Sequence, residues 1–289
     1  MDSPTVLRRR LGSELRRLRE RTGLQAKAAA DALQFSATKV SRIESGQTTL
    51  KESDVRAMLE LYGVTDAAEL HQFISLTRRS TQRGWWHDFG DTLPDWFQTY
   101  VGLEADSARI RTYETELVPG LLQTPDYARA VFRASLANQD GDIEEIVNRR
   151  AKLRMQRQEV INRPEPPTVW VVLSESVLRR PVGGPEVMAQ QLKFLAELAQ
   201  RPNITLQILP FSAGAHAAMS MAFRILSFSD VPGEIVYVEA LTSSLYIEKE
   251  SDIARHETVF NQLAATAMTP EESESWIRRL ETEGCGHGT

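Results

Sequence analysis

The sequence predicts an α+β protein with an all-helical N-terminal domain, a helical linker region, and an α+β domain with a mixed or antiparallel sheet. Three observations support this fold class. Apolar residues recur at helical spacing from residue 5 to residue 80. Strand-like runs such as TVWVVL, residues 168–173, begin only after a proline-rich break. The 289 residues exceed one ordinary domain and can bury two cores.

Five helices are expected in the N-terminal part. They cover residues 5–21, 26–33, the stretch between Ser36 and Gly46, 53–63 and 66–80. Leucines at spacings of four, four and three give the first helix one apolar face. Ser36 is the expected N-cap of the third helix, because its hydroxyl can accept a hydrogen bond from a backbone N–H of the first turn. Gly46 is the expected C′ residue that ends this helix.

The third helix has one apolar face and one polar face. Val40 and Ile43 are expected to point inward, which leaves a strip of short polar residues and one arginine outside. The outward residues are Ala37, Thr38, Ser41 and Arg42. An arginine can donate two hydrogen bonds to guanine O6 and N7, so this strip predicts insertion into the DNA major groove. The alternative is an αα-hairpin inside an all-helical core, which short alanine-rich helices often form.

Charge is divided unequally along the chain. Residues 1–83 hold 15 Lys and Arg against 10 Asp and Glu, a net charge of +5, while the remainder holds 19 against 29, a net charge of −10. Arginines concentrated on the first helix could neutralise DNA phosphates. The alternative for these arginines is an ordinary solvated helix face.

Residues 23–46 closely resemble the helix-turn-helix of the lambdoid phage repressors and of bacterial XRE-family regulators. The resemblance rests on Ala30 at the helix crossing and on the run from Val40 to Gly46. It implies a lambda-repressor-like fold and double-stranded DNA as a partner. The DNA-binding residues expected on this basis are Gln25, Lys27, Ser36, Ala37, Thr38, Lys39, Ser41 and Arg42. Phosphate contacts are expected from Arg16 and Arg19 of the arginine-rich first helix, and from Gln47.

Two positions depart from that family pattern. Gln34 replaces the usual turn glycine and would need a positive φ. Ala26 replaces a glutamine that touches phosphate in the family, and whether Gln25 substitutes for it stays open. Glu44 is expected to be structural, fixing the end of the recognition helix.

An aromatic cluster follows the helical domain. Residues 85–100 contain Trp85, Trp86, Phe89, Trp96, Phe97 and Tyr100. Such a cluster could bind an aromatic or cationic ligand. The alternative is a packing element that joins two domains or forms a dimer interface.

The elements of the C-terminal part are expected in the order helices, then strands mixed with helices. Residues 104–163 are expected to be helical, with one segment running through Arg111. The expected strands cover residues 168–173, 204–209, 222–228, 235–239 and a short edge at 245–247, and the later helices cover 186–200, 252–268 and 270–281. We expect these helices on one side of the sheet.

The C-terminal part resembles the domain that accompanies helix-turn-helix modules in actinobacterial regulators of the WhiJ kind. The resemblance rests on TELVPGLLQTPDYARAV, RMQRQEVI and the stretch from VLRRPVGGPEVMAQQLKFL to ILPFSAGAH. It implies a developmental or antibiotic-production regulator, with a small acidic or BldB-like partner protein. The expected domains are 1–83 for DNA binding, 84–282 for sensing or partner binding, and 283–289 as a flexible tail.

Enzymatic motifs are weak, so no catalytic residue, cofactor or metal is expected. Ser220 and Lys249 could mimic a self-cleaving Ser-Lys dyad, but their spacing is short and no matching cleavage bond precedes them. Neither G-x-S-x-G nor H-E-x-x-H occurs. His216 lies among small residues that could leave space for a ligand, although a loop histidine without function is the alternative.

The composition suggests a cytoplasmic, nucleoid-associated protein without a membrane segment. Cys285 is the single cysteine, and no apolar run reaches bilayer length. We expect a sequence-specific transcriptional regulator that binds as a homodimer and is controlled through its C-terminal domain by a small partner protein or ligand. The alternative is an antitoxin-like protein that grips its partner and mainly regulates its own promoter.

Overall fold

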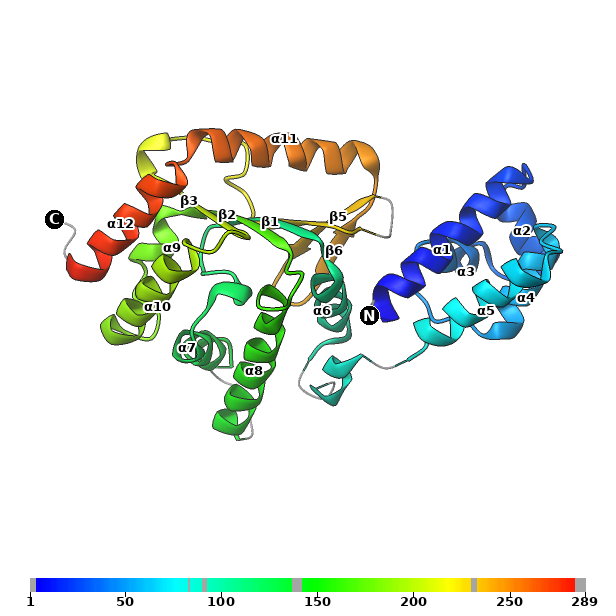
Figure 1. Cartoon of the computed structure of the whole chain (residues 1–289), viewed down its shortest axis with the longest axis horizontal. Helices are drawn as coiled ribbons and strands as arrows, with labels where there is room; N and C mark the ends of the chain where they lie inside the picture. The colour runs from blue at the N-terminus through cyan, green and yellow to red at the C-terminus, as the bar shows by residue number, and fades with distance from the viewer. Residues whose placement is uncertain (1–3, 83, 90–92, 137–141, 230–232, 284–289) are drawn as a thin grey trace. The chain divides into compact units, whose positions relative to one another are not determined.

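The computed structural model describes residues 4–82, 84–89, 93–136, 142–229 and 233–283, and the chain forms two compact units (Figure 1). The first unit contains the described residues up to Asp88 together with Gln98–Asp106. The second contains the described residues of Phe89–Phe97, of Ser107–Ser229 and from Gly233 onward. The tail predicted to be flexible lies, from residue 284, outside the described residues.

Five α-helices form the N-terminal part of the first unit between residues 4 and 80, as the sequence predicted. They are α1 (Pro4–Arg21), α2 (Ala26–Leu33), α3 (Ala37–Glu44), α4 (Glu52–Leu61) and α5 (Ala67–Ser80). Their apolar faces share one core, which includes Leu11, Leu15, Ile43, Val55 and Met58. Burial of these side chains is the main force that holds such short helices together.

The aromatic cluster is divided between the two units. A 3-10 helix, Trp85–Phe89, precedes α6 (Asp95–Asp106). In the first unit, Trp86 is 3% exposed, and a Cβ added at Gly102 would lie 2.9 Å from its ring. In the second unit, Trp96 and Phe97 form an edge-to-face pair with ring centroids 5.8 Å apart. These contacts are packing contacts.

A six-stranded mixed sheet forms the centre of the second unit, in the order β3-β2-β1-β4-β5-β6. The strands are β1 (Arg109–Glu114), β2 (Thr168–Ser174), β3 (Ile204–Leu209), β4 (Phe223–Ser227), β5 (Glu234–Glu239) and β6 (Ser244–Ile247). β1, β2 and β3 pair in parallel, whereas β4, β5 and β6 pair antiparallel. The α+β prediction is therefore confirmed, including the short edge strand near residue 245.

The helical assignment through Arg111 was wrong, because residues 109–114 form β1 in the middle of the sheet. β1 carries three charged residues, and a side chain from a distant segment pairs with each of them. Arg109 pairs with Glu234 at 3.1 Å. Arg111 bonds to Glu234 at 2.7 Å and to Glu257 at 2.8 Å. Glu114 bonds to Arg224 at 2.6 Å. These long-range pairs allow a charged strand to be buried.

Helices cover both faces of the sheet, so the expectation of helices on one side was also wrong (Figure 1). The helices are α7 (Pro125–Ser135), α8 (Ile143–Gln158), α9 (Glu175–Arg179), α10 (Pro185–Leu198), α11 (Glu250–Thr266) and α12 (Pro270–Glu283). On one face, Trp170 of β2 meets Phe260 of α11 with ring centroids 5.5 Å apart. On the other face, Val171 and Leu173 are fully buried.

Candidate nucleic-acid interface

The turn between α2 and α3 has the geometry that the helix-turn-helix resemblance implied. Gln34 adopts φ 55° and ψ 36°, the left-handed region that a glycine occupies more easily. The backbone N–H of Phe35 donates to the carbonyl of Ala30 at 2.9 Å, which closes the end of α2. The chain therefore turns sharply enough to bring α3 across α2.

The start of α3 is fixed by its cap. Ser36 Oγ accepts a hydrogen bond from the backbone N–H of Lys39 at 3.0 Å, as predicted for an N-cap. Val40 and Ile43 are fully buried, which orients the helix about its axis. The side chains on the opposite face are exposed, namely Ala37, Thr38, Ser41 and Arg42. This face is polar, narrow and open, which suits a major groove.

Helix α1 holds the end of α3 through two glycines. A Cβ added at Gly12 would lie 2.3 Å from the carbonyl oxygen of Ile43, so the two backbones touch directly. Gly46 has φ 69°, and a Cβ there would lie 2.6 Å from Cα of Arg9. The role of Gly46 as the C′ residue was predicted, whereas the close approach at Gly12 was not.

An ion pair between α1 and α3 completes this attachment. Arg19 donates to the two carboxylate oxygens of Glu44 at 2.7 and 2.8 Å, and also to the carbonyl of Leu24 at 2.7 Å. The hydrogen bond that Arg19 donates to the Glu44 carboxylate raises the pKa of Arg19 above its ordinary value. Arg19 is only 7% exposed and its guanidinium is paired with Glu44, which favours a structural role over the phosphate contact suggested for it. That phosphate contact stays an untested prediction. Glu44 has the structural role that the sequence suggested.

Lys39 is held by two attractions within the first unit. Its Nζ lies 2.9 Å from Oδ2 of Asp54 on α4 and 3.4 Å from the centre of the Phe35 ring. Its side chain is 39% exposed and that of Asp54 is 23% exposed. The ammonium group is therefore already paired at the surface where the sequence expected a DNA contact.

The other suggested DNA-binding residues lie on the surface. Gln25, Lys27, Ser36 and Gln47 are exposed, and the Gln25 side chain is not used to cap α2. Arg16 is exposed, although its Nε lies 2.8 Å from Glu20 on the same helix. The DNA contacts of these residues stay predictions.

In the second unit, exposed apolar side chains collect at one edge of the sheet. Leu241 is 97% exposed, Met219 68% and Phe211 60%. Phe211 follows the end of β3, Met219 precedes the antiparallel β4, and Leu241 follows the end of β5. The pairing directions place all three beyond the carboxyl ends of β1, β2 and β3. We call these residues, with Met221 and Leu245, the apolar edge.

His216 anchors the loop that carries part of the apolar edge. Its Nε2 lies 3.1 Å from the hydroxyl of Tyr113, and its Nδ1 accepts from the backbone N–H of Ala218 at 3.3 Å. Nδ1 must be unprotonated for this bond, so in the neutral ring Nε2–H donates to Tyr113. Burial raises the pKa of Tyr113 to about 12, which keeps its hydroxyl neutral. The contacts of His216 are therefore those of a loop anchor.

The elements of a self-cleaving dyad lie apart. Ser220 is exposed in the turn before β4 begins, at the carboxyl edge of the parallel strands. Lys249 follows the end of β6, and the pairing of β6 with β5 places that end at the opposite edge. The two side chains are therefore not neighbours, and no Ser-Lys dyad forms.

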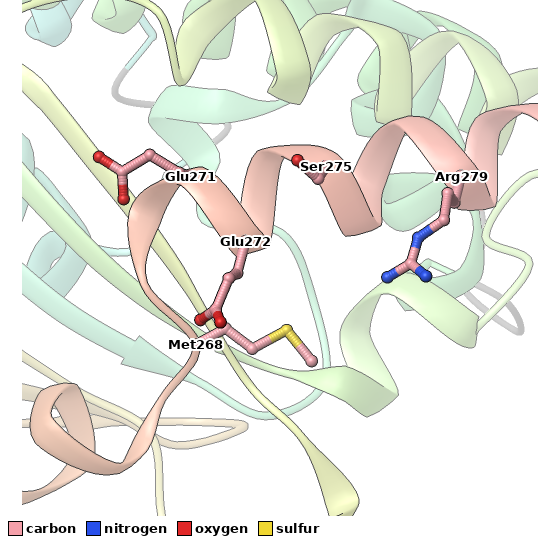
Figure 2. A pocket seen from close by; sticks show the side chains of 5 residues that line it. All are labelled: Met268, Glu271, Glu272, Ser275 and Arg279. Carbon is pink, nitrogen blue, oxygen red and sulfur yellow. The ribbon is translucent and has the colours of Figure 1, made fainter.

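A depression of about 420 Å³ lies beside α12, lined by Met268, Glu271, Glu272, Ser275 and Arg279. Figure 2 shows that Met268, Glu272 and Arg279 point to one side of the helix, while Glu271 points away from them. Glu272 accepts from the backbone N–H of Thr269 at 2.8 Å in a capping box. That bond explains its position without a ligand.

No group of three or more His, Cys, Asp and Glu side chains is arranged to hold a metal ion within the described ranges. No helix in the described part of the chain has the length and apolar character to cross a bilayer.

Comparison with protein families gives two matches. Residues 10–73 match a family described as a helix-turn-helix domain. Residues 97–279 match a family described as a domain of unknown function, DUF5753. No match was found among curated proteins or solved structures. The first match agrees with the geometry of α2 and α3, and a domain of that kind suggests a DNA-binding regulator.

Proposed function

The chain belongs to the DUF5753 family and carries a helix-turn-helix domain before the matched region, and we propose that it is a sequence-specific transcriptional regulator. In this proposal the protein is not an enzyme, and it acts in the cytoplasm in association with the nucleoid. The observation that best supports this proposal is the exposed outer face of α3. Thr38, Ser41 and Arg42 are exposed there, while Val40 and Ile43 fix the orientation of the helix. Arg42 supplies the bidentate donor for guanine.

We propose that the regulator binds DNA as a homodimer. The base-reading face consists of four outward residues on a helix of eight. One such helix presents too little surface for tight operator binding, and a two-fold dimer doubles it. The expected site is palindromic or nearly so, with half-sites about one helical turn apart.

We propose that the second unit receives the control signal from a small partner protein, which the WhiJ-like resemblance implies. Residues after 83 carry a net charge of −10, so this part of the chain is repelled by DNA. The apolar edge offers a surface for a protein instead, because its large apolar side chains are exposed at the same end of the sheet, and exposed apolar surface can mark protein contacts. A small ligand is the alternative signal.

The apolar edge is also compatible with a second function, that of an antitoxin-like protein whose main role is to bind its partner protein. A genome-wide binding map of the full-length protein separates the two functions. A regulator of many genes occupies many sites, whereas a protein that regulates only its own promoter occupies essentially one. Absence of any occupied site would contradict both.

Partner binding is tested with substitutions at the apolar edge. The protein encoded beside this chain is the probe, and binding is measured by calorimetry with full-length variants. Leu241→Asp and Met219→Asp should each weaken binding at least tenfold, because a charge would be buried in the interface. Ala254→Asp, on the exposed side of α11, is the control and should bind as the unchanged protein does. Equal binding by all three variants would contradict this location.

A further inference from the structure

We propose that Asp54 is a positioning residue that holds Lys39 away from the DNA backbone and so limits the sequence-independent part of DNA affinity. This inference rests on the proposed DNA-binding function. It concerns the role of an acidic side chain that the sequence did not single out. The proposal joins three side chains of the first unit, Phe35, Lys39 and Asp54.

The geometry of the three side chains carries the inference. Lys39 extends from the first turn of α3, whereas Asp54 lies in the first turn of α4. Their charged atoms are 2.9 Å apart, and the same ammonium lies 3.4 Å above the Phe35 ring. The carboxylate and the electron-rich ring face both attract a cation. The Lys39 side chain is thus held against Asp54 and Phe35 of the first unit.

Arg42, the other cationic residue of α3, differs from Lys39 in its pairing. Arg42 is exposed, and within the part of the chain that the structure describes no carboxylate pairs with it. One helix therefore presents one available cation and one neutralised cation. Asp54 is the group that makes this difference.

The electrostatic consequence follows from the charge of the pair. A phosphate near Lys39 would also lie near the carboxylate of Asp54. The repulsion between that carboxylate and the phosphate therefore offsets the attraction between Lys39 and the phosphate. A lysine that contacts phosphate releases a condensed counterion and adds the same affinity to every sequence. Pairing with Asp54 removes that contribution. The affinity that remains comes to a larger extent from base contacts.

Salt dependence tests the proposal. Binding of the full-length protein to a random-sequence DNA duplex is measured from 50 to 200 mM salt by fluorescence anisotropy. For Asp54→Asn, the slope of log affinity against log salt should steepen by about 0.9, the value of one added phosphate contact. Over that salt range the affinity should then fall about 3.5-fold more than that of the unchanged protein. Affinity at 50 mM salt should rise.

Three further variants test whether the release of Lys39 from Asp54 causes the steeper salt slope. Lys39→Gln should leave the slope of the unchanged protein as it is, because Lys39 makes no phosphate contact there. The double variant of Lys39→Gln with Asp54→Asn should lose the steepening. Glu52→Gln is the control, because it removes another carboxylate from the first turn of α4. Glu52 pairs with Arg78 of α5 at 2.6 Å and not with Lys39, so the salt slope of this variant should equal that of the unchanged protein. Thermal unfolding of each variant checks the fold.

Several results would overturn the inference. An unchanged slope for Asp54→Asn would show that Lys39 stays away from DNA without Asp54. A slope reduced by about 0.9 in Lys39→Gln alone would show that Lys39 already contacts a phosphate. This test remains valid even if the Asp54→Asn variant does not fold. No binding of the unchanged protein to any duplex would contradict the proposed function, and this inference with it.

Discussion

Arg42 is the residue on which the sequence preference of the proposed interface depends most. It lies on the exposed face of α3, one turn after Thr38. We expect Arg42→Ala to lose about 1–3 kcal/mol of binding free energy for the preferred site, because a bidentate contact to guanine disappears. Affinity for random duplex DNA should change little. Equal losses on both DNAs, measured by anisotropy, would mean that Arg42 contacts only a phosphate.

Arg19 and Arg16 should respond differently to substitution, although both lie on α1. Arg19→Ala leaves the carboxylate of Glu44 buried without its partner, so the free energy of unfolding should fall by about 3–5 kcal/mol. Arg16→Ala removes an exposed pair and should leave stability almost unchanged. The same variant should reduce the salt slope of DNA binding by about 0.9 if Arg16 meets a phosphate. Denaturant unfolding and anisotropy measure the two effects, and a stable Arg19→Ala would contradict the structural role.

Conformations set by neighbouring residues were predictable at this scale, whereas partners distant in sequence were not. The cap at Ser36 follows from the local sequence, and the positive φ of Gln34 follows from the helix-turn-helix resemblance, in which a turn glycine occupies that position. The pairing of Arg19 with Glu44 joins residues 25 positions apart. In the sequence, Arg19 was one of several arginines on a basic helix, and only the crossing of α1 and α3 distinguishes it.

The attachment of α1 to α3 is the feature that positions the proposed reading helix. Gly12→Ala should lower the free energy of unfolding by about 1–3 kcal/mol, because the added Cβ would meet backbone oxygens that cannot move aside easily. Specific DNA affinity should fall as well, since α3 must shift. Ser13→Ala, one position along α1, is the matched control. Circular dichroism and anisotropy measure the pair, and equal stability of the two variants would contradict the close contact.

The elements that were predicted correctly have a strong local signal. β2, β3 and β5 are rich in β-branched and apolar residues, and α7 begins with a threonine cap followed by proline. β1 lacks such a signal because its sequence, RIRTYE, mixes charges with apolar residues. Its charges become compatible with burial only through Glu234, Glu257 and Arg224, which lie more than 100 positions away. No local pattern contains that information.

The whole molecule combines a basic and an acidic part in one chain. We expect a homodimer, because a single α3 presents too little surface for tight binding to an operator. Light scattering at micromolar concentration should give twice the mass of the 32.5 kDa chain. The complex with DNA should contain two chains per duplex. A monomer in solution together with one chain per duplex would contradict the dimer.

Sequence selection from a random duplex pool tests the central claim most directly, namely that the outer face of α3 reads DNA sequence. The full-length protein is incubated with the pool at physiological salt, and bound duplexes are amplified and sequenced over several rounds. The account predicts an enriched, nearly palindromic site with half-sites about one helical turn apart, each containing a guanine whose enrichment is lost with Arg42→Ala. A pool that stays random while the protein still binds it would contradict the claim.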